Sequence, residues 1–176
     1  MRLTTKGRFA VTAMIDLAMI DQVITDQVIC EDTRSAASSF ATTSPVTLAS
    51  ISERQGISLA YLEQLFGKLR KRGIVVAVRG PGGGYSLARP STQISIADII
   101  AAVDEPVDAT RCGGKANCRE GRQCLTHDLW EGLTLAIDGY LSGVSLQQVI
   151  NSQQMAKKNI AKITLRKRVV QPRISA

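Results

Sequence analysis

The feature of this sequence that most constrains its fold is a change of hydrophobic period near its middle. Residues 47–55 and 59–72 place apolar side chains at helical spacing, with a glycine in the turn between them. The spacing then follows the two-residue period of strands, in runs at 74–79 and 85–87 joined by Gly80-Pro-Gly-Gly-Gly84. Two short helices followed by a hairpin predict a helix-turn-helix that carries a β wing.

Helices are also predicted on both sides of this motif. Residues 8–20 carry an apolar stripe along one helix face, with Asp16 on the other side. Ser95 is placed to cap a helix over 96–105, and residues 126–142 form a longer helical pattern. The predicted fold class is therefore mainly α with a small β wing, to which a loop and a long helix are added.

Three regions are expected along the chain. Residues 1–91 form the winged helix-turn-helix domain, interrupted at 26–46 by an inserted loop rich in serine, threonine and alanine. Residues 92–151 hold a cysteine-containing loop and further helices. Residues 152–176 form a basic tail, expected to be disordered or to add phosphate contacts. The tail has seven basic and no acidic residues, so it accounts for the whole net charge of +7.

Composition and patterning exclude several classes of protein. No apolar run approaches the ~18 residues needed to cross a bilayer. The first residues lack the apolar stretch of a secretory signal. We therefore expect a cytoplasmic protein that does not enter a membrane. In that reducing setting its four cysteines are more often metal ligands or reactive thiols than disulfides.

The 59–72 helix and the adjoining wing predict a surface that binds duplex DNA. Five basic and no acidic residues lie between positions 68 and 79, and an α-helix fits the major groove, where each base pair shows a distinct pattern. Glu63 is suited to accept a hydrogen bond from cytosine, and Gln64 to bond adenine. Lys68 and Lys71 suit phosphates, which set affinity and register rather than sequence. The alternative is a winged helix that binds a protein partner.

A second group of residues has the composition of a metal centre. The pattern Cys112-x5-Cys118-x5-Cys124-x2-His127 places three thiols and the single histidine of the chain within a glycine-rich stretch. Zinc accepts three cysteines and a histidine, but its thiols usually come from closer pairs. A [2Fe–2S] cluster needs four ligands over two irons, which suits the wider spacing. Spacing alone favours the cluster and leaves zinc open.

Two cysteines allow roles other than metal binding. Cys30 lies in the inserted loop, outside this group, and is expected to be incidental. Cys124 and His127 could form a nucleophile and base, but the sequence offers no orienting group or oxyanion site, so an enzyme is not expected.

The last long helix predicts a dimer contact. Its large apolar residues recur at alternating intervals of three and four, the narrow seam of a coiled coil: Trp130, Leu133, Ile137, Tyr140 and Val144. The alternative is a helix packed wholly within its own chain. Helix-turn-helix proteins commonly form dimers that place two recognition helices in successive major grooves.

The sequence resembles the IscR family of iron–sulfur cluster regulators over about residues 1–20 and 46–151. The opening Met1-Arg-Leu-Thr-Thr-Lys-Gly-Arg, the wing Val78-Arg-Gly-Pro-Gly-Gly-Gly-Tyr85 and the spacing of the three cysteines and histidine carry the likeness. The segments Ile51–Leu59, Tyr61–Phe66 and Val103–Cys112 extend it.

This resemblance implies a homodimeric bacterial transcription factor with a [2Fe–2S] cluster on Cys112, Cys118, Cys124 and His127. The loaded form would repress the genes for cluster assembly, the cluster-assembly machinery would supply the cluster, and other promoters would be bound with or without it. The alternatives are a related regulator that responds to nitric oxide or redox state and a zinc-stabilised interaction module. By position, the resemblance implies that Glu63 and Gln64 read bases and that Arg79 is the wing residue that reaches the minor groove. The full set of expected DNA contacts is Ser58, Ala60, Tyr61, Glu63, Gln64, Lys68, Lys71 and Arg79.

Overall fold

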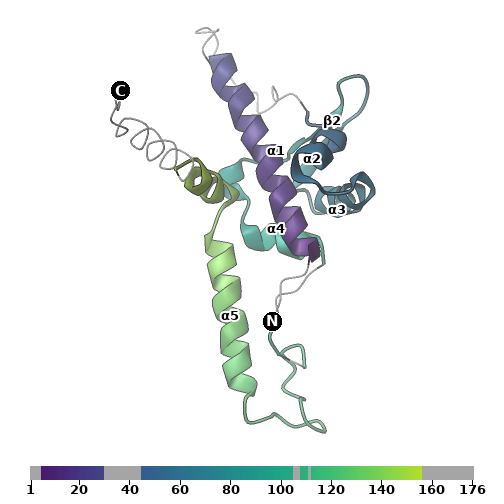
Figure 1. The fold of residues 1–176 in the computed structure, drawn as a ribbon. Helices are drawn as coiled ribbons and strands as arrows, with labels where there is room; N and C mark the ends of the chain where they lie inside the picture. The colour runs from purple at the N-terminus through teal and green to yellow at the C-terminus, as the bar shows by residue number, and fades with distance from the viewer. Residues whose placement is uncertain (1–4, 30–44, 105–107, 111, 156–176) are drawn as a thin grey trace, which may run out of the picture.

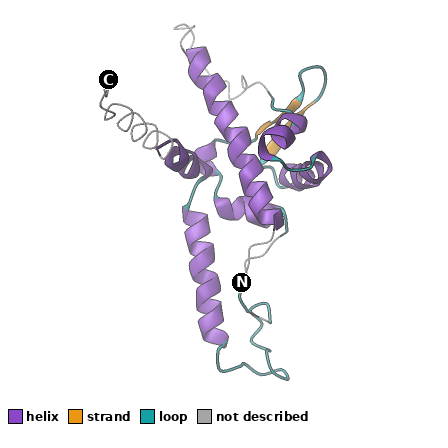
Figure 2. Ribbon diagram, in the orientation of Figure 1, coloured by secondary structure: helices purple, strands orange, loops and turns teal. Residues whose placement is uncertain are grey.

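The computed structural model describes residues 5–29, 45–104, 108–110 and 112–155 of the chain. Most of the predicted tail therefore lies outside the described residues, although residues 152–155 continue a helix that begins at 146. Figures 1 and 2 show a mainly helical body with a two-stranded wing, as predicted. The elements in chain order are α1 (Thr5–Ile29), α2 (Leu48–Gln55), α3 (Leu59–Lys71), β1 (Val75–Val78), β2 (Gly84–Leu87), a 3-10 turn (Ser91–Gln93), α4 (Ile96–Ala102) and α5 (His127–Gly143).

The helix-turn-helix forms where the sequence predicts it, because both of its helices are capped. Thr47 Oγ1 accepts a hydrogen bond from the Ser50 amide at 3.2 Å at the start of α2. Gly56 ends α2 at a φ of 64°, a conformation that costs other residues energy. Ser58 Oγ accepts from the Tyr61 amide at 3.3 Å and begins α3.

The wing pairs β1 with β2 antiparallel, from Val75 opposite Leu87 to Val78 opposite Gly84. Val46 lies beside the outer edge of β2 and exchanges two backbone hydrogen bonds with Tyr85, at 2.9 and 2.8 Å. A Cβ on Gly84 would lie 2.5 Å from the Val46 carbonyl oxygen, so only glycine fits this approach. The last residue of the predicted 26–46 loop therefore pairs with β2 through one antiparallel bridge.

The first helix extends beyond residues 8–20 and runs on through the repeated Asp-Gln-Val-Ile segments at 21–24 and 26–29. The apolar stripe ends near residue 20, but α1 continues to Ile29, because residues 21–29 contain no glycine or proline to stop it. The start of the predicted 26–46 loop is thus helical, and residues 30–44 lie outside the described residues.

One hydrophobic core joins all of these elements. The buried face of α1, which crosses the middle of the molecule in Figure 1, includes Met14 and Leu17. This core continues past residue 91 into α4 through Ile99 and on to Leu146 and Ile150. Two backbone hydrogen bonds tie these segments together, from Ile96 to the Val144 carbonyl and from Leu146 to the Ile94 carbonyl. The helix-turn-helix and the helices after it therefore share a single packed body.

The predicted 96–105 helix is shorter in the structure. Ser95 caps it as expected, and a reciprocal bond from the Ser95 amide to Asp98 completes a capping box. The helix ends at Ala102, and Asp104 follows with a φ of 55°. This left-handed backbone is rare for a residue with a side chain.

The long helix α5 projects from the body as an arm (Figure 1). Its C-terminal end rests on the body, where Leu141 and Val144 pack against the core. Its N-terminal end is the far tip, and the chain reaches that tip through the loop that contains the cysteines. None of the described helices is both long and apolar enough to cross a membrane.

Asp16 is buried, which the sequence pattern did not predict. It lies only 9% exposed beneath α2, where Arg54 Nη2 donates to it at 2.7 Å and Gln55 Nε2 at 2.9 Å. The hydrogen bond to Asp16 also raises the pKa of Arg54. The helical pattern of α1 placed Asp16 on the solvent side, and this was wrong because α2 packs over that face with two donors.

We predict that Asp16→Ala lowers the free energy of unfolding by about 1–2 kcal/mol, because Arg54 and Gln55 lose a charged acceptor at a half-buried site. Urea unfolding followed by circular dichroism measures the change. Glu53→Ala, an exposed change on the same helix as Arg54, should alter stability by less than about 0.5 kcal/mol. Equal effects of the two changes would contradict a structural role for this ion pair.

A candidate metal centre and nucleic-acid interface

The cysteine loop at the tip of the arm is held in an unusual backbone conformation. Gly113, Gly114 and Gly121 have positive φ angles, and so do Ala116 at 54° and Glu120 at 48°. The last two cost energy because a Cβ disfavours this region, and such strain gathers at functional sites. The result is a short segment of chain that folds back on itself and turns its thiols inward.

Three of the predicted donors lie in direct contact. Cys118 Sγ is 3.4 Å from Cys112 Sγ. His127 Nδ1 lies 3.3 Å from Cys118 Sγ and 3.5 Å from Cys112 Sγ. All three atoms fall within 4.8 Å of one another, close enough to share a metal ion. The structure thus brings together residues that the sequence separates by up to fifteen positions.

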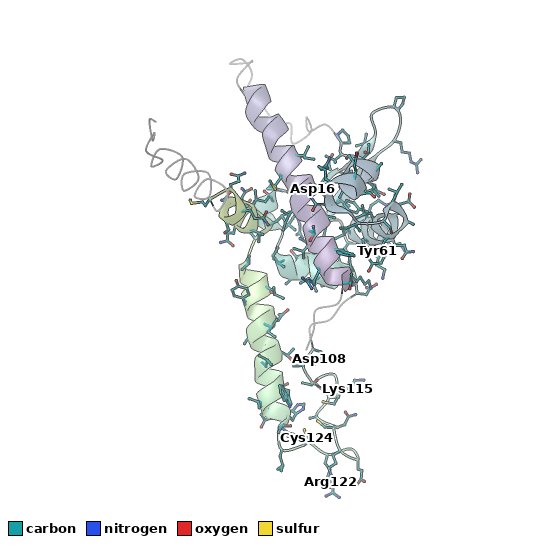
Figure 3. The ribbon with its side chains drawn as sticks, in the orientation of Figure 1. Asp16, Tyr61, Asp108, Lys115, Arg122 and Cys124 are labelled. Atoms are coloured by element: carbon teal, nitrogen blue, oxygen red, sulfur yellow. The ribbon has the colours of Figure 1, made fainter. Side chains whose placement is uncertain are left out.

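The fourth predicted donor, Cys124, lies on the same cavity but outside this trio. The cavity has a volume of about 360 Å³, and Cys118, Cys124, His127 and Trp130 line it with neighbouring residues of the loop. Cys124 Sγ lies 3.7 Å from Thr126 Oγ1, and Figure 3 shows it at the N-terminal end of α5. Three of the four donors therefore line one cavity, and Cys112 joins them through its contacts with Cys118 and His127.

His127 is placed by the helix that it begins. It is the first residue of α5, and its amide donates to the Cys124 carbonyl at 3.1 Å, which fixes the turn between the two donors. Its side chain is 3% exposed and is the one buried side chain of α5. The helix therefore presents a single imidazole, already desolvated, to the thiols.

The loop shifts the acidity of its thiols in different directions. Burial raises the pKa of Cys112, but hydrogen bonds from Cys118, Thr110 and the Ala116 backbone outweigh it and lower the pKa to about 7. The Thr126 side chain and backbone lower the pKa of Cys124. The pKa of Cys118 is raised, because burial and its two thiol neighbours outweigh a hydrogen bond to the Cys124 backbone. Metals bind thiolates, so the lowered values favour ligation by Cys112 and Cys124.

The predicted DNA contacts lie together on α3 and the wing. Ala60, Glu63, Gln64 and Lys71 are exposed on α3, and Arg79 is exposed just after β1. Helix α3 and the wing lie on the right of the molecule in Figure 1, away from the arm. This arrangement fits insertion of α3 into a major groove with the wing beside it.

Three residues of the predicted DNA surface also make contacts within the protein. Ser58 caps α3, and the Tyr61 ring packs edge-on against Phe9 with centroids 6.0 Å apart. Lys68 Nζ lies 2.8 Å from Asp104 Oδ2. No sequence pattern predicts this ion pair, because Asp104 is distant in the chain and meets Lys68 only through the packing of α4 on α3.

Lys68 and Asp104 shift each other's acidity in the expected directions. The hydrogen bond to Asp104 is the largest cause of the raised pKa of Lys68. The same bond lowers the pKa of Asp104, and the nearby charges of Lys6 and Arg72 add to the effect. Both groups therefore remain charged at neutral pH, and the ammonium of Lys68 already has an anionic partner.

The apolar stripe of α5 is exposed along most of its length. Trp130, Leu133 and Tyr140 are all exposed, Tyr140 by 71%, and Ile137 is half-buried. Val144 differs from the predicted seam, because it lies beyond the last turn of α5 and packs against the core of its own chain. Leu129, which the seam pattern omitted, lies near the same face and is also exposed. Exposed apolar surface of this kind marks an interaction site.

The fold is that of a winged helix-turn-helix protein, and the exposed surface of α3 and the wing is suited to duplex DNA. A family model described as Rrf2, iron-dependent transcriptional regulator, matches residues 35–152. The chain belongs to the Rrf2 family of transcriptional regulators.

Individual relatives agree with this assignment. The chain is 51% identical to the HTH-type transcriptional regulator IscR of Photorhabdus laumondii over 88% of this chain and 82% of that one. It is 56% identical to a Neisseria meningitidis protein provisionally described as an HTH-type transcriptional regulator, over 87% and 90%. The solved structure of T. potens IscR matches with a TM-score of 0.65 and 31% identity, over 89% of this chain and 90% of that one.

Proposed function

We propose that this regulator holds a [2Fe–2S] cluster on Cys112, Cys118, Cys124 and His127, and that cluster occupancy controls which promoters it binds. The genes for cluster assembly would be repressed by the loaded form, and other promoters would be regulated with or without it. The observation that carries the proposal is the contact of Cys112 and Cys118 with His127, the only histidine of the chain, beside a cavity at the tip of the arm that Cys118, Cys124 and His127 line. The family description as iron-dependent supports iron as the metal.

The donor set suits a [2Fe–2S] cluster, which takes four protein ligands over two irons. Cys112, Cys118 and His127 lie in direct contact, and Cys124 interacts with the Cys118 thiol. The wide spacing of the cysteines along the chain and the family description as iron-dependent favour iron over a single zinc ion, whose thiols usually come from closer pairs. When bound, such a cluster supplies a one-electron redox centre whose presence depends on iron and on oxidants.

The ion pair between Lys68 and Asp104 offers a physical link from this site to DNA. Asp104 is the last described residue before the segment that leads to the cysteine loop, and Lys68 lies on the DNA-facing helix. A carboxylate that holds the ammonium competes with a DNA phosphate for it. A cluster bound by the 112–127 loop would change the conformation of that loop. This change would alter the position of Asp104 and therefore the strength of its ion pair with Lys68.

The exposed stripe of α5 is proposed to form the contact of a homodimer. The large apolar side chains of this stripe are largely exposed within a single chain. A second copy of the chain offers an identical stripe that can cover them. Two copies would present two α3 helices to one face of a duplex. We place this dimer in the cytoplasm, with the cluster-assembly machinery as the donor of its cluster.

The metal content tests the cofactor directly. Protein purified without oxygen should contain iron and inorganic sulfide in equal amounts, about two of each per chain. Cys124→Ser should remove most of both, because one iron loses a thiolate, whereas Cys30→Ser should leave both unchanged. Zinc without sulfide in the native protein would contradict the proposal and support the zinc-stabilised module.

Two substitutions on α3 separate base reading from phosphate contact. Glu63→Ala should change sequence preference, with a loss of about 1–3 kcal/mol of discrimination at one base pair. Lys71→Ala should weaken binding to all sequences alike and reduce the slope of log affinity against log salt by about one. Fluorescence anisotropy on a panel of duplexes measures both. Equal losses on every duplex from Glu63→Ala would show that this carboxylate does not read a base.

The dimer contact is tested by a charge in the stripe. Tyr140→Glu should weaken self-association about 100-fold, because it places a carboxylate in an apolar contact worth about 3 kcal/mol. Analytical ultracentrifugation measures the change. Asp138→Ala alters the same helix away from the stripe and should leave the dimer intact. A monomeric native protein, or a Tyr140→Glu variant that associates normally, would contradict this contact.

A further inference from the structure

The two nitrogens of the His127 ring face different partners. Nδ1 points at the sulfurs of Cys118 and Cys112, at 3.3 and 3.5 Å. Nε2 points the other way, toward Glu131 Oε2 at 3.8 Å. Because the side chain is only 3% exposed, solvent has little access to this ring, and a hydrogen on Nε2 needs a partner within the protein.

Helical geometry supplies that partner. Glu131 lies four residues after His127 in α5, and residues at this spacing are neighbours on one face of a helix. The other acidic residue of this turn, Asp128, accepts a hydrogen bond from Gln123 and is engaged with the loop. Glu131 is 49% exposed, so a small change of its rotamer closes the gap from 3.8 Å to hydrogen-bond length.

We propose that Glu131 is a positioning residue for the metal ligand His127. Its carboxylate accepts a hydrogen bond from the Nε2 hydrogen, which leaves the lone pair of Nδ1 directed at the thiols and makes Nδ1 the ligating atom. This inference rests on the proposed metal site and adds a residue and an atom to it. A carboxylate behind a histidine ligand fixes the ring and makes it a stronger donor, and loss of such a partner typically weakens metal binding 10–100-fold.

The single histidine of the chain allows this arrangement to be tested without a metal. In the 15N NMR spectrum of the full-length, metal-free protein at alkaline pH, one imidazole contributes, and its hydrogen should lie on Nε2. Glu131→Ala should shift the ring toward a mixture of the two tautomers, while Glu131→Gln, which keeps an acceptor oxygen, should largely preserve the native tautomer. Asp138→Asn, an exposed acid on the same face two turns further along α5, should have no effect.

A second readout uses the loaded protein. Transfer of iron to an excess of chelator should be about 10–100-fold faster for Glu131→Ala than for the native chain, with Glu131→Gln between them. The reduction potential should rise from the native chain through Glu131→Gln to Glu131→Ala, because a less basic imidazole stabilises the oxidised iron less. Pulsed EPR of 15N-labelled, reduced protein should show coupling to Nδ1.

The outcomes separate the inference from the function on which it rests. A native Nδ1–H tautomer, or a Glu131→Ala variant with an unchanged tautomer and unchanged iron release, overturns the role of Glu131 even if the cluster is present. Protein without iron and sulfide overturns the proposed cofactor, while the tautomer measurement still decides whether Glu131 positions the ring.

Discussion

The contact of one buried imidazole with two thiols is the interaction on which the outer part of this molecule depends. His127 begins α5 and meets Cys112 and Cys118 across a loop whose backbone is strained at Ala116 and Glu120. The loop is too short and too rich in glycine to bury a core of its own, so its conformation depends on what its side chains bind. Because thiols and an imidazole can act as metal ligands, a metal bound at this point would stabilise the loop and α5 together.

The cysteine loop and the candidate DNA surface on α3 are joined by a series of helices that pack against one another. The arm rests on α4 at its base, α4 packs on α1 and α3, and Asp104 at the end of α4 holds Lys68 of α3. The shared core means that a change at the arm acts on a packed body rather than through a loose linker. The Lys68–Asp104 ion pair is a contact in this path that a DNA phosphate could replace directly.

Local patterns predicted most of the fold and the set of candidate ligands, and they failed where distant segments meet. The cap at Ser95 and the wing turn depend on neighbours in the chain, so the sequence was sufficient for them. Burial of Asp16 depends on α2, and the pairing of Lys68 depends on α4, which no periodicity within one helix reveals. The neighbour of His127 was within reach of prediction, since Glu131 follows it by four residues, but the direction of each ring nitrogen required coordinates.

The most direct test of the account is the affinity of loaded and metal-free protein for the same duplexes, measured at one salt concentration. If occupancy of the 112–127 loop controls DNA binding, the two forms should differ about 5–150-fold on at least one promoter class. Asp104→Asn should narrow that difference, because Lys68 is then released in both forms. Identical affinities of the two forms on every duplex would contradict the link between the metal centre and the DNA surface.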